Sequence, residues 1–166
     1  MLILVRHAHA GDKRLWPFGD ADRPLSGRGQ EQALGLARQL GELPVRRLVT
    51  SPYRRCRQTL APLAEQLGLT PETETRLAPD GEPATVEQLL LGPDTEGSLF
   101  CTHGELLNAL LQCWRESGVV ELPAEPITTP KGGTWILEQS GGRWVGHYLK
   151  PLRVVLPGGR KAAAVP

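Results

Sequence analysis

The 166-residue sequence is poor in cysteine and aromatic residues and has almost no excess of charge of either sign. Its three cysteines are odd in number and lack metal-type spacing, which favours reduced thiols over a disulfide framework. Lysine and arginine total 19 against 18 for aspartate and glutamate, so no basic footprint for nucleic acid or an anionic membrane is present. No apolar run approaches the roughly 20 residues of a membrane-spanning helix, and the opening MLILV is too short for a secretory signal. We therefore expect a cytoplasmic protein without nucleic-acid or membrane partners.

The length of the chain favours one domain with its own hydrophobic core. We predict that this domain spans residues 1–156 and that residues 157–166, PGGRKAAAVP, form a flexible tail, because small residues, glycine and proline show no periodicity there. Three short apolar runs have the form of buried strands, and each is followed by a helical pattern: residues 2–5, 47–51 and 98–102. This alternation predicts an α/β fold, a three-layer α/β/α sandwich on a mostly parallel sheet.

Capping residues, glycines and prolines delimit the predicted helices. These helices span residues 26–41, 51–68, 83–91 and 104–116, with a break in the second at Pro62. Near the C-terminus, TWILEQ and RWVGHYLK flank SGG, which predicts a hairpin added at an edge of the sheet. Residues 11–24 and 123–133 are the long connections, and we expect them to be substrate-binding loops.

Polar clusters follow each of the three predicted strands. Arg6 and His7 follow the first strand, SPYRRCR begins at Ser51 after the second, and His103 and Gly104 follow the third. Because ligands of open parallel sheets bind beyond the carboxyl ends of the strands, we expect these side chains to meet in one crevice. Arginine matches phosphate oxygens bidentately and histidine can attack phosphorus, so the set predicts a site for a phosphoryl group.

An attack by His7 on phosphorus requires a ring nitrogen without a proton. Nearby guanidinium groups disfavour the imidazolium form, and a backbone carbonyl would hold the other ring nitrogen and so set the tautomer. His103 and the arginines would stabilise the phosphoryl oxygens, and the amide of Gly104 would add a donor at a helix start. Phosphoryl transfer requires mainly positioning and charge, which these residues supply.

RHA at residues 6–8, SPYRRCRQT at 51–59 and THGE at 102–105 resemble the motifs of the histidine phosphatase superfamily, also called the phosphoglycerate mutase-like superfamily. Ala8 in place of the usual glycine is similar to the small phosphohistidine phosphatase-type branch. The resemblance implies a metal-independent hydrolase without cofactors that forms a phosphohistidine intermediate. It implies these catalytic residues by position: His7 as nucleophile, Arg6 and Arg55 as phosphate ligands, and His103 as the second histidine.

The acidic proton donor of that family has no clear match in this sequence. Asp80, Glu82 and Glu105 are the candidates for the general acid. A phosphoramidate or a phosphoanhydride needs less help from an acid than an alkyl ester does, because its leaving group is better. A phosphohistidine protein, a nucleotide and a small phosphomonoester therefore all stay open as substrates, and the oligomeric state is not predicted.

A finer similarity concerns two further segments. DADRPLSGRG at residues 20–29 and TPKGGTWILE at 129–138 are similar to the phosphatase-type domain that follows a Nudix domain in some actinobacterial nucleotide hydrolases. This similarity favours a nucleotide-like substrate. It makes Lys13, Arg14 and Lys131 candidates for contacts with further phosphates.

Two other interpretations of the same residues are open. His7, His9, His103 and Asp12 could in principle hold a zinc ion that activates water, although two arginines fit badly beside a metal. The pocket could also belong to a non-catalytic module that binds phosphate or a nucleotide without turnover. Singly, His103 is more typical of a hydrogen-bonded core histidine, the three acids are typical of surface carboxylates, and Lys13, Arg14 and Lys131 are typical of exposed cations.

Overall fold

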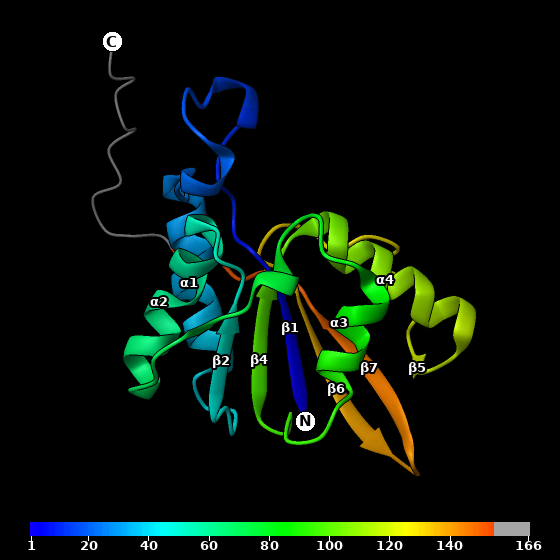
Figure 1. Cartoon of the computed structure of the whole chain (residues 1–166). Helices are drawn as coiled ribbons and strands as arrows, with labels where there is room; N and C mark the ends of the chain where they lie inside the picture. The colour runs from blue at the N-terminus through cyan, green and yellow to red at the C-terminus, as the bar shows by residue number, and fades with distance from the viewer. Residues whose placement is uncertain (155–166) are drawn as a thin grey trace.

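A computed structural model describes residues 1–154, in which seven strands form one mixed sheet between two layers of helices (Figure 1). In sheet order the strands are β3 (Glu72–Thr73), β2 (Arg47–Thr50), β4 (Ser98–Thr102), β1 (Leu2–Arg6), β6 (Thr134–Ser140), β7 (Arg143–Leu149) and β5 (Val120–Glu121). The first four run parallel to one another, and β6 and β7 add an antiparallel hairpin beside β1. The predicted tail, residues 157–166, lies outside the described residues.

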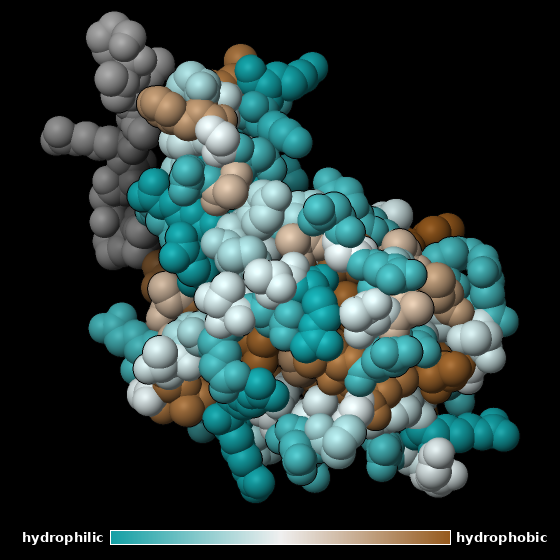
Figure 2. Space-filling view, in the orientation of Figure 1, coloured by the Kyte–Doolittle hydropathy of each residue, from teal (hydrophilic) through white to brown (hydrophobic). Residues whose placement is uncertain are grey.

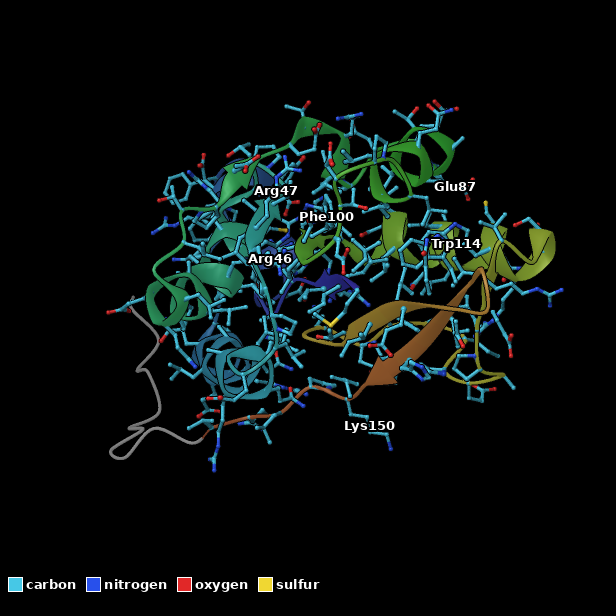
Figure 3. The ribbon with its side chains drawn as sticks, turned by 90° about the horizontal axis from the view of Figure 1, so that it is seen from below. Arg46, Arg47, Glu87, Phe100, Trp114 and Lys150 are labelled. Atoms are coloured by element: carbon cyan, nitrogen blue, oxygen red, sulfur yellow. The ribbon has the colours of Figure 1, made fainter. Side chains whose placement is uncertain are left out.

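Two pairs of helices cover the faces of the sheet. They are α1 (Gly27–Leu40) and α2 (Arg54–Leu67) on one face, and α3 (Pro83–Leu90) and α4 (Gly104–Ser117) on the other. Phe100 of β4 lies in the core on the α3 and α4 side (Figure 3). On the same side the indole Nε1 of Trp114 donates to the carboxylate of Glu87 at 2.6 Å and so links α4 to α3. The predicted three-layer α/β/α sandwich is thereby confirmed.

The parallel register brings the carboxyl ends of β1, β2 and β4 to one rim of the sheet, at the top in Figure 1. Arg6 at the end of β1 pairs with Thr102 at the end of β4, and Thr50 of β2 pairs with Cys101. The loops that leave these three strands therefore start side by side. This shared rim is where the fold can assemble residues that lie far apart in the sequence.

Local signals place most element boundaries. The Ser26 side chain accepts a hydrogen bond from the amide of Gly29 and caps α1. Pro83 occupies the first turn of α3, where its missing N–H costs nothing. Gly141 and Gly142 both have positive φ, as the tight turn between β6 and β7 requires.

The predicted break of the second helix at Pro62 is wrong, because α2 continues through this residue to Leu67. Leu60 before the proline and Leu63 after it are both buried in the core cluster that α2 forms with α1 and the sheet. We attribute the continuity to this packing, which outweighs the one backbone hydrogen bond that proline removes.

The short strands differ from the sequence-based expectations. The predicted hairpin does extend the sheet, but the two-residue strand β5 lies outside it and forms the edge. Strands β3 and β5 are too short to leave a periodic pattern in the sequence. All three cysteines are free, and Cys113 lies exposed, whereas Cys56 and Cys101 are buried. Within residues 1–154, no helix has both the length and the apolar character that crossing a membrane requires.

Candidate active site

A cleft of about 870 Å³ opens at the rim where β1, β2 and β4 end. Five cationic side chains line it: Arg6, Lys13, Arg23, Arg55 and Lys131. Two of the aspartates at the cleft are already paired, because Asp12 binds Arg14 at 2.7 Å and Asp20 binds both Arg23 and Arg55. The cleft is therefore suited to an anionic ligand.

His7, at the floor of the cleft, is held in one tautomer. Its Nδ1 lies 2.7 Å from the carbonyl oxygen of Ala8, which accepts a hydrogen bond from Nδ1–H and so assigns the lone pair to Nε2. That Nε2 accepts a hydrogen bond from Nε of Arg55 at 3.2 Å. Burial, more than the charges of Arg55 and Arg6, lowers the pKa of His7 to about 3. The ring is thus neutral near pH 7, although desolvation contributes more than the guanidinium groups that the sequence pointed to.

Arg55 is buried and lies between the two histidines. Besides its contact with His7, it places Nη2 3.1 Å from Nδ1 of His103 and 3.1 Å from Oδ2 of Asp20. Its Nη1 donates to the carbonyl oxygen of Asp20 at 2.8 Å, and the guanidinium carbon lies 4.6 Å from the centre of the Tyr53 ring. The guanidinium plane is therefore held from several sides.

His103, which ends the β4 loop at the start of α4, is fully buried. Because Nδ1 accepts from Arg55, the ring carries its proton on Nε2, which donates to Oγ of Ser51 at 2.8 Å. Burial, followed by the charge of Arg55, lowers the pKa of His103 to about 2. The two histidine rings meet edge to face with their centres 5.2 Å apart.

Arg6 reaches the cleft by crossing a glycine. A Cβ on Gly104 would overlap the guanidinium group of Arg6, so any other residue there would push this side chain out of its position. Nη1 of Arg6 donates to the carbonyl oxygen of Thr129 at 2.6 Å, whereas its buried Nε has no hydrogen-bond partner among residues 1–154. From the sequence we expected Gly104 to contribute its backbone amide as a donor. The structure adds a second role, because the missing side chain leaves room for Arg6.

The loop after β1 is tied to both neighbouring segments. The amide of Ala8 donates to Oγ1 of Thr59 at 2.9 Å, and Thr59 in turn donates to the carbonyl oxygen of Arg55 at 2.7 Å. On the other side the amide of Gly132 contacts the carbonyl oxygens of Arg6 and His7. Thr59, the last residue of the SPYRRCRQT motif, therefore holds the loop that carries His7 against α2.

The structure separates the candidate acids. Asp80 and Glu105 line the cleft, although both are exposed. Glu82 does not line it, because this residue caps α3 and its carboxylate accepts a hydrogen bond from Thr85. The general acid therefore has two candidates at the cleft instead of three.

The three candidate cations of the rim are separated in the same way. Lys13 and Lys131 line the cleft, and burial together with the charge of Arg6 lowers the pKa of Lys131. Arg14 is not part of the lining and instead holds Asp12 in an exposed ion pair. We therefore retain Lys13 and Lys131 as candidates for substrate contacts.

Sequence reasoning missed Asp20, Arg23 and Tyr53 as parts of the site. Arg23 is buried, donates to Asp20 at 2.8 Å and to the carbonyl oxygen of Ala10 at 2.7 Å, and so anchors the loop that carries Asp20. Burial opposes ionisation of Asp20, but the hydrogen bond from Arg23 and the charge of Arg55 lower its pKa below the usual range. Asp20 and Arg23 lie in the DADRPLSGRG segment, whose similarity to nucleotide hydrolases we noted without assigning a role to either residue.

The zinc interpretation finds no ligand set in the described part of the chain. His9 lines the cleft, but its Nδ1 contacts Oγ of Ser26 at 2.7 Å. Among residues 1–154, no group of three histidine, cysteine, aspartate or glutamate side chains is arranged to hold a metal ion. His147, the fourth histidine of the sequence, lies exposed on β7.

Comparisons with known proteins agree with this geometry. Residues 2–78 match the family model described as the histidine phosphatase superfamily (branch 1). Over 156 residues the chain is 33% identical to the 8-oxo-(d)GTP phosphatase of Mycolicibacterium smegmatis, with 90% of this chain covered. The chain belongs to the histidine phosphatase superfamily. It spans about half the length of this curated relative, 48%.

Solved structures of histidine phosphatases share the fold. A putative phosphohistidine phosphatase SixA from Agrobacterium tumefaciens superposes with a TM-score of 0.74 at 22% identity, covering 90% of this chain and 97% of that one. The protein histidine phosphatase SixA complexed with tungstate gives 0.68 at 22% identity over 92% and 96% of the two chains. A mycobacterial glucosyl-3-phosphoglycerate phosphatase gives 0.61 at 20% identity over 88% and 96%.

Proposed function

We propose that the protein is a metal-independent phosphatase in which His7 takes a phosphoryl group from the substrate and then passes it to water. The observation that carries this proposal is the state of His7. Its unprotonated Nε2 lies at the floor of a cationic cleft, 3.2 Å from Arg55, while the Ala8 carbonyl holds the opposite nitrogen. This is the arrangement that a nitrogen nucleophile for phosphorus requires.

The reaction consists of two in-line transfers. In the first, the Nε–H of Arg55 moves its hydrogen bond from Nε2 of His7 to a phosphoryl oxygen. The freed lone pair of Nε2 forms a bond to phosphorus while the bond from phosphorus to the leaving oxygen or nitrogen breaks. In the second, a water molecule attacks the phosphorus, the bond to Nε2 breaks, and inorganic phosphate leaves. The proton remains on Nδ1, hydrogen-bonded to the Ala8 carbonyl oxygen, in both steps, so the ring returns to its starting tautomer.

Arg6 and Arg55 balance the charge on the phosphoryl oxygens in both steps. Asp20 and His103 hold Arg55 from two sides, so the guanidinium is already oriented before the substrate arrives. In the observed tautomer His103 offers no N–H to a ligand, because Nε2 donates to Ser51. We therefore assign His103 first to positioning Arg55. A bound phosphoryl dianion raises the pKa of this ring and favours its protonation and a direct contact.

The leaving group receives its proton from Asp80 or Glu105, the two acids at the cleft. Both carboxylates are exposed to solvent and are not enclosed at the floor of the cleft. This favours substrates whose leaving groups need little protonation, such as phosphoanhydrides and phosphoramidates. Among these we favour a nucleoside polyphosphate, because the curated relative is an 8-oxo-(d)GTP phosphatase and because Lys13 and Lys131 line the same cleft.

Trapping the phosphoenzyme tests the proposal. The wild-type chain should hydrolyse an aryl phosphate and yield an acid-labile, base-stable phosphoryl group on rapid quenching. His7→Ala should lower kcat at least about 10⁴-fold and abolish the trapped group, because the nucleophile is removed. His147→Ala, which changes an exposed histidine on β7, is the matched control and should retain activity. Binding of phosphate without turnover by the wild type would instead support the non-catalytic module.

A panel of substrates then shows which class of leaving group the protein prefers. Nucleoside diphosphates and triphosphates, a phosphohistidine protein and a sugar phosphate are compared by released phosphate. We expect the highest kcat/KM for the nucleotides. A preference for the phosphohistidine protein would overturn the nucleotide assignment and leave the mechanism in place.

A further inference from the structure

A second, smaller cavity of about 210 Å³ adjoins the candidate active site. Gly11, Asp12 and Arg23 line both this cavity and the cleft, so the two spaces lie next to each other. The rest of its wall is largely apolar and includes Leu15, Trp16, Pro24 and Leu25. None of the steps proposed for the phosphoryl transfer uses these residues.

The outer wall of the cavity belongs to residues 11–24, which we call the arm and which project above the rim of the sheet (Figure 1). The arm places hydrophobic residues beside hydrophilic ones at the surface (Figure 2). Leu15 is 82% exposed and Phe18 70% exposed. The Trp16 ring packs edge to face on Phe18, and its Nε1 donates to the carbonyl oxygen of Gly19 at 3.1 Å. Apolar groups that stay exposed beside a cleft are typical of a binding surface.

We propose that this cavity binds the base of a purine nucleoside polyphosphate whose terminal phosphoryl group reaches His7. The inference rests on the proposed function and adds the part of the site that selects the substrate. Trp16 supplies a flat aromatic surface on which a base can stack, and Leu15 and Pro24 supply aliphatic contacts. The cavity is large enough for a bicyclic ring and too small for a folded peptide element.

The charge between the two spaces supports a polyphosphate as the link. Arg23 lines both of them, and Lys13 and Lys131 line the cleft together with Arg6. Cations at the cleft compensate the charge of a polyphosphate. An apolar side chain of a protein substrate would fill the cavity without using these cations, so the arrangement fits a nucleotide better than a phosphohistidine protein.

The test compares guanosine diphosphate with inorganic pyrophosphate, which has the same phosphoanhydride but no base. Trp16→Ala should lower the ratio of kcat/KM for guanosine diphosphate to that for pyrophosphate about tenfold, because stacking on the indole is lost. Trp16→Phe should restore most of the ratio, since a phenyl ring retains a stacking face. Val119→Ala, an exposed aliphatic residue that lines neither cavity, is the matched control and should leave the ratio unchanged.

Calorimetric titration with guanosine diphosphate gives a readout that does not depend on turnover. We expect Trp16→Ala to raise its Kd about tenfold and His7→Ala to retain binding. An unchanged ratio and an unchanged Kd in Trp16→Ala would overturn the base subsite, even if the wild type hydrolyses aryl phosphate through His7. Conversely, an inactive wild type with a Trp16-dependent Kd would overturn the proposed reaction and support the subsite.

Discussion

The floor of the cleft and the arm above it differ in how deeply their side chains are buried and in how many hydrogen bonds hold them. At the floor His7, Arg55 and His103 are at most 4% exposed, and every ring nitrogen and guanidinium nitrogen of these three residues has a partner. On the arm Leu15 and Phe18 are mostly exposed. In the proposed function the buried network carries out the phosphoryl transfer, and in the proposed base subsite the exposed loop selects the substrate.

The physical reason is the cost of leaving a buried polar group without a partner. Each contact at the floor replaces water that cannot enter, so the loss of one partner leaves another group unsatisfied. Leu15 and Phe18, the exposed apolar residues of the arm, lose few protein contacts when they are replaced. Substitutions in the two regions should therefore differ in size and in kind.

Of the substitutions that compare the two regions, Arg55→Lys should produce the largest effect, lowering kcat/KM about 10²- to 10³-fold. The lysine ammonium retains the charge but cannot contact His7, Asp20 and His103 at once, as the guanidinium fork does. Steady-state kinetics with an aryl phosphate measure the loss. Arg54→Lys, one residue earlier and exposed, is the control and should change little. Equal effects of the two variants would contradict the role of Arg55.

The floor should also make the protein sensitive to acid. The pKa values of His7 and His103 are lowered to about 3 and about 2 in the folded state, whereas unfolded histidine titrates near 6.5. Protons therefore bind the unfolded chain first, and stability falls as the pH drops below about 6.5. From pH 7.5 to 5.5 each ring should lower the free energy of unfolding by about 1.4 kcal/mol.

Urea unfolding at the two pH values measures this difference. A His7→Asn variant should lose about half of the pH dependence, whereas His147→Gln, changed at an exposed ring, should retain all of it. A free energy of unfolding that stays constant between pH 7.5 and 5.5 would show that the two rings are not buried in neutral form.

Thr59→Val should lower the free energy of unfolding by about 2 kcal/mol. The change keeps the shape of the side chain but removes the acceptor of the buried Ala8 amide and the donor to the Arg55 carbonyl. Thr59→Ser retains the hydroxyl and should keep most of the stability. Chemical denaturation of the three proteins provides the measurement, and equal stabilities of the valine and serine variants would refute the explanation.

Phe18→Ser on the arm should have the smallest effect and change the free energy of unfolding by less than about 0.5 kcal/mol. Phe18 is largely exposed and its described ring contact is with Trp16. The same denaturation experiment applies. A loss as large as that of Thr59→Val would mean that the arm is part of the core and would remove the contrast between the two regions.

Much of the fold could be predicted because its signals are local. The apolar runs that became β1, β2 and β4 are buried on both faces. Local backbone chemistry marks other boundaries: Ser26 the start of α1, Pro83 the start of α3, and Gly141–Gly142 the turn between β6 and β7. Pro62 was misinterpreted because the local rule was correct and tertiary packing outweighed it. Strands β3 and β5 have two residues each and exist only through their neighbours.

The features of the site also separate into those that local sequence signals predict and those that depend on tertiary packing. The sequence by itself determined which residues stand at the carboxyl ends of the strands, because strand periodicity and parallel pairing bring Arg6, His7, Ser51 and His103 to one rim. Only the tertiary structure decided how these residues act on each other. Burial lowers the histidine pKa values, Gly104 admits Arg6, and Asp20 turns Arg55 toward His7, and each of these effects depends on atoms that meet across long stretches of chain.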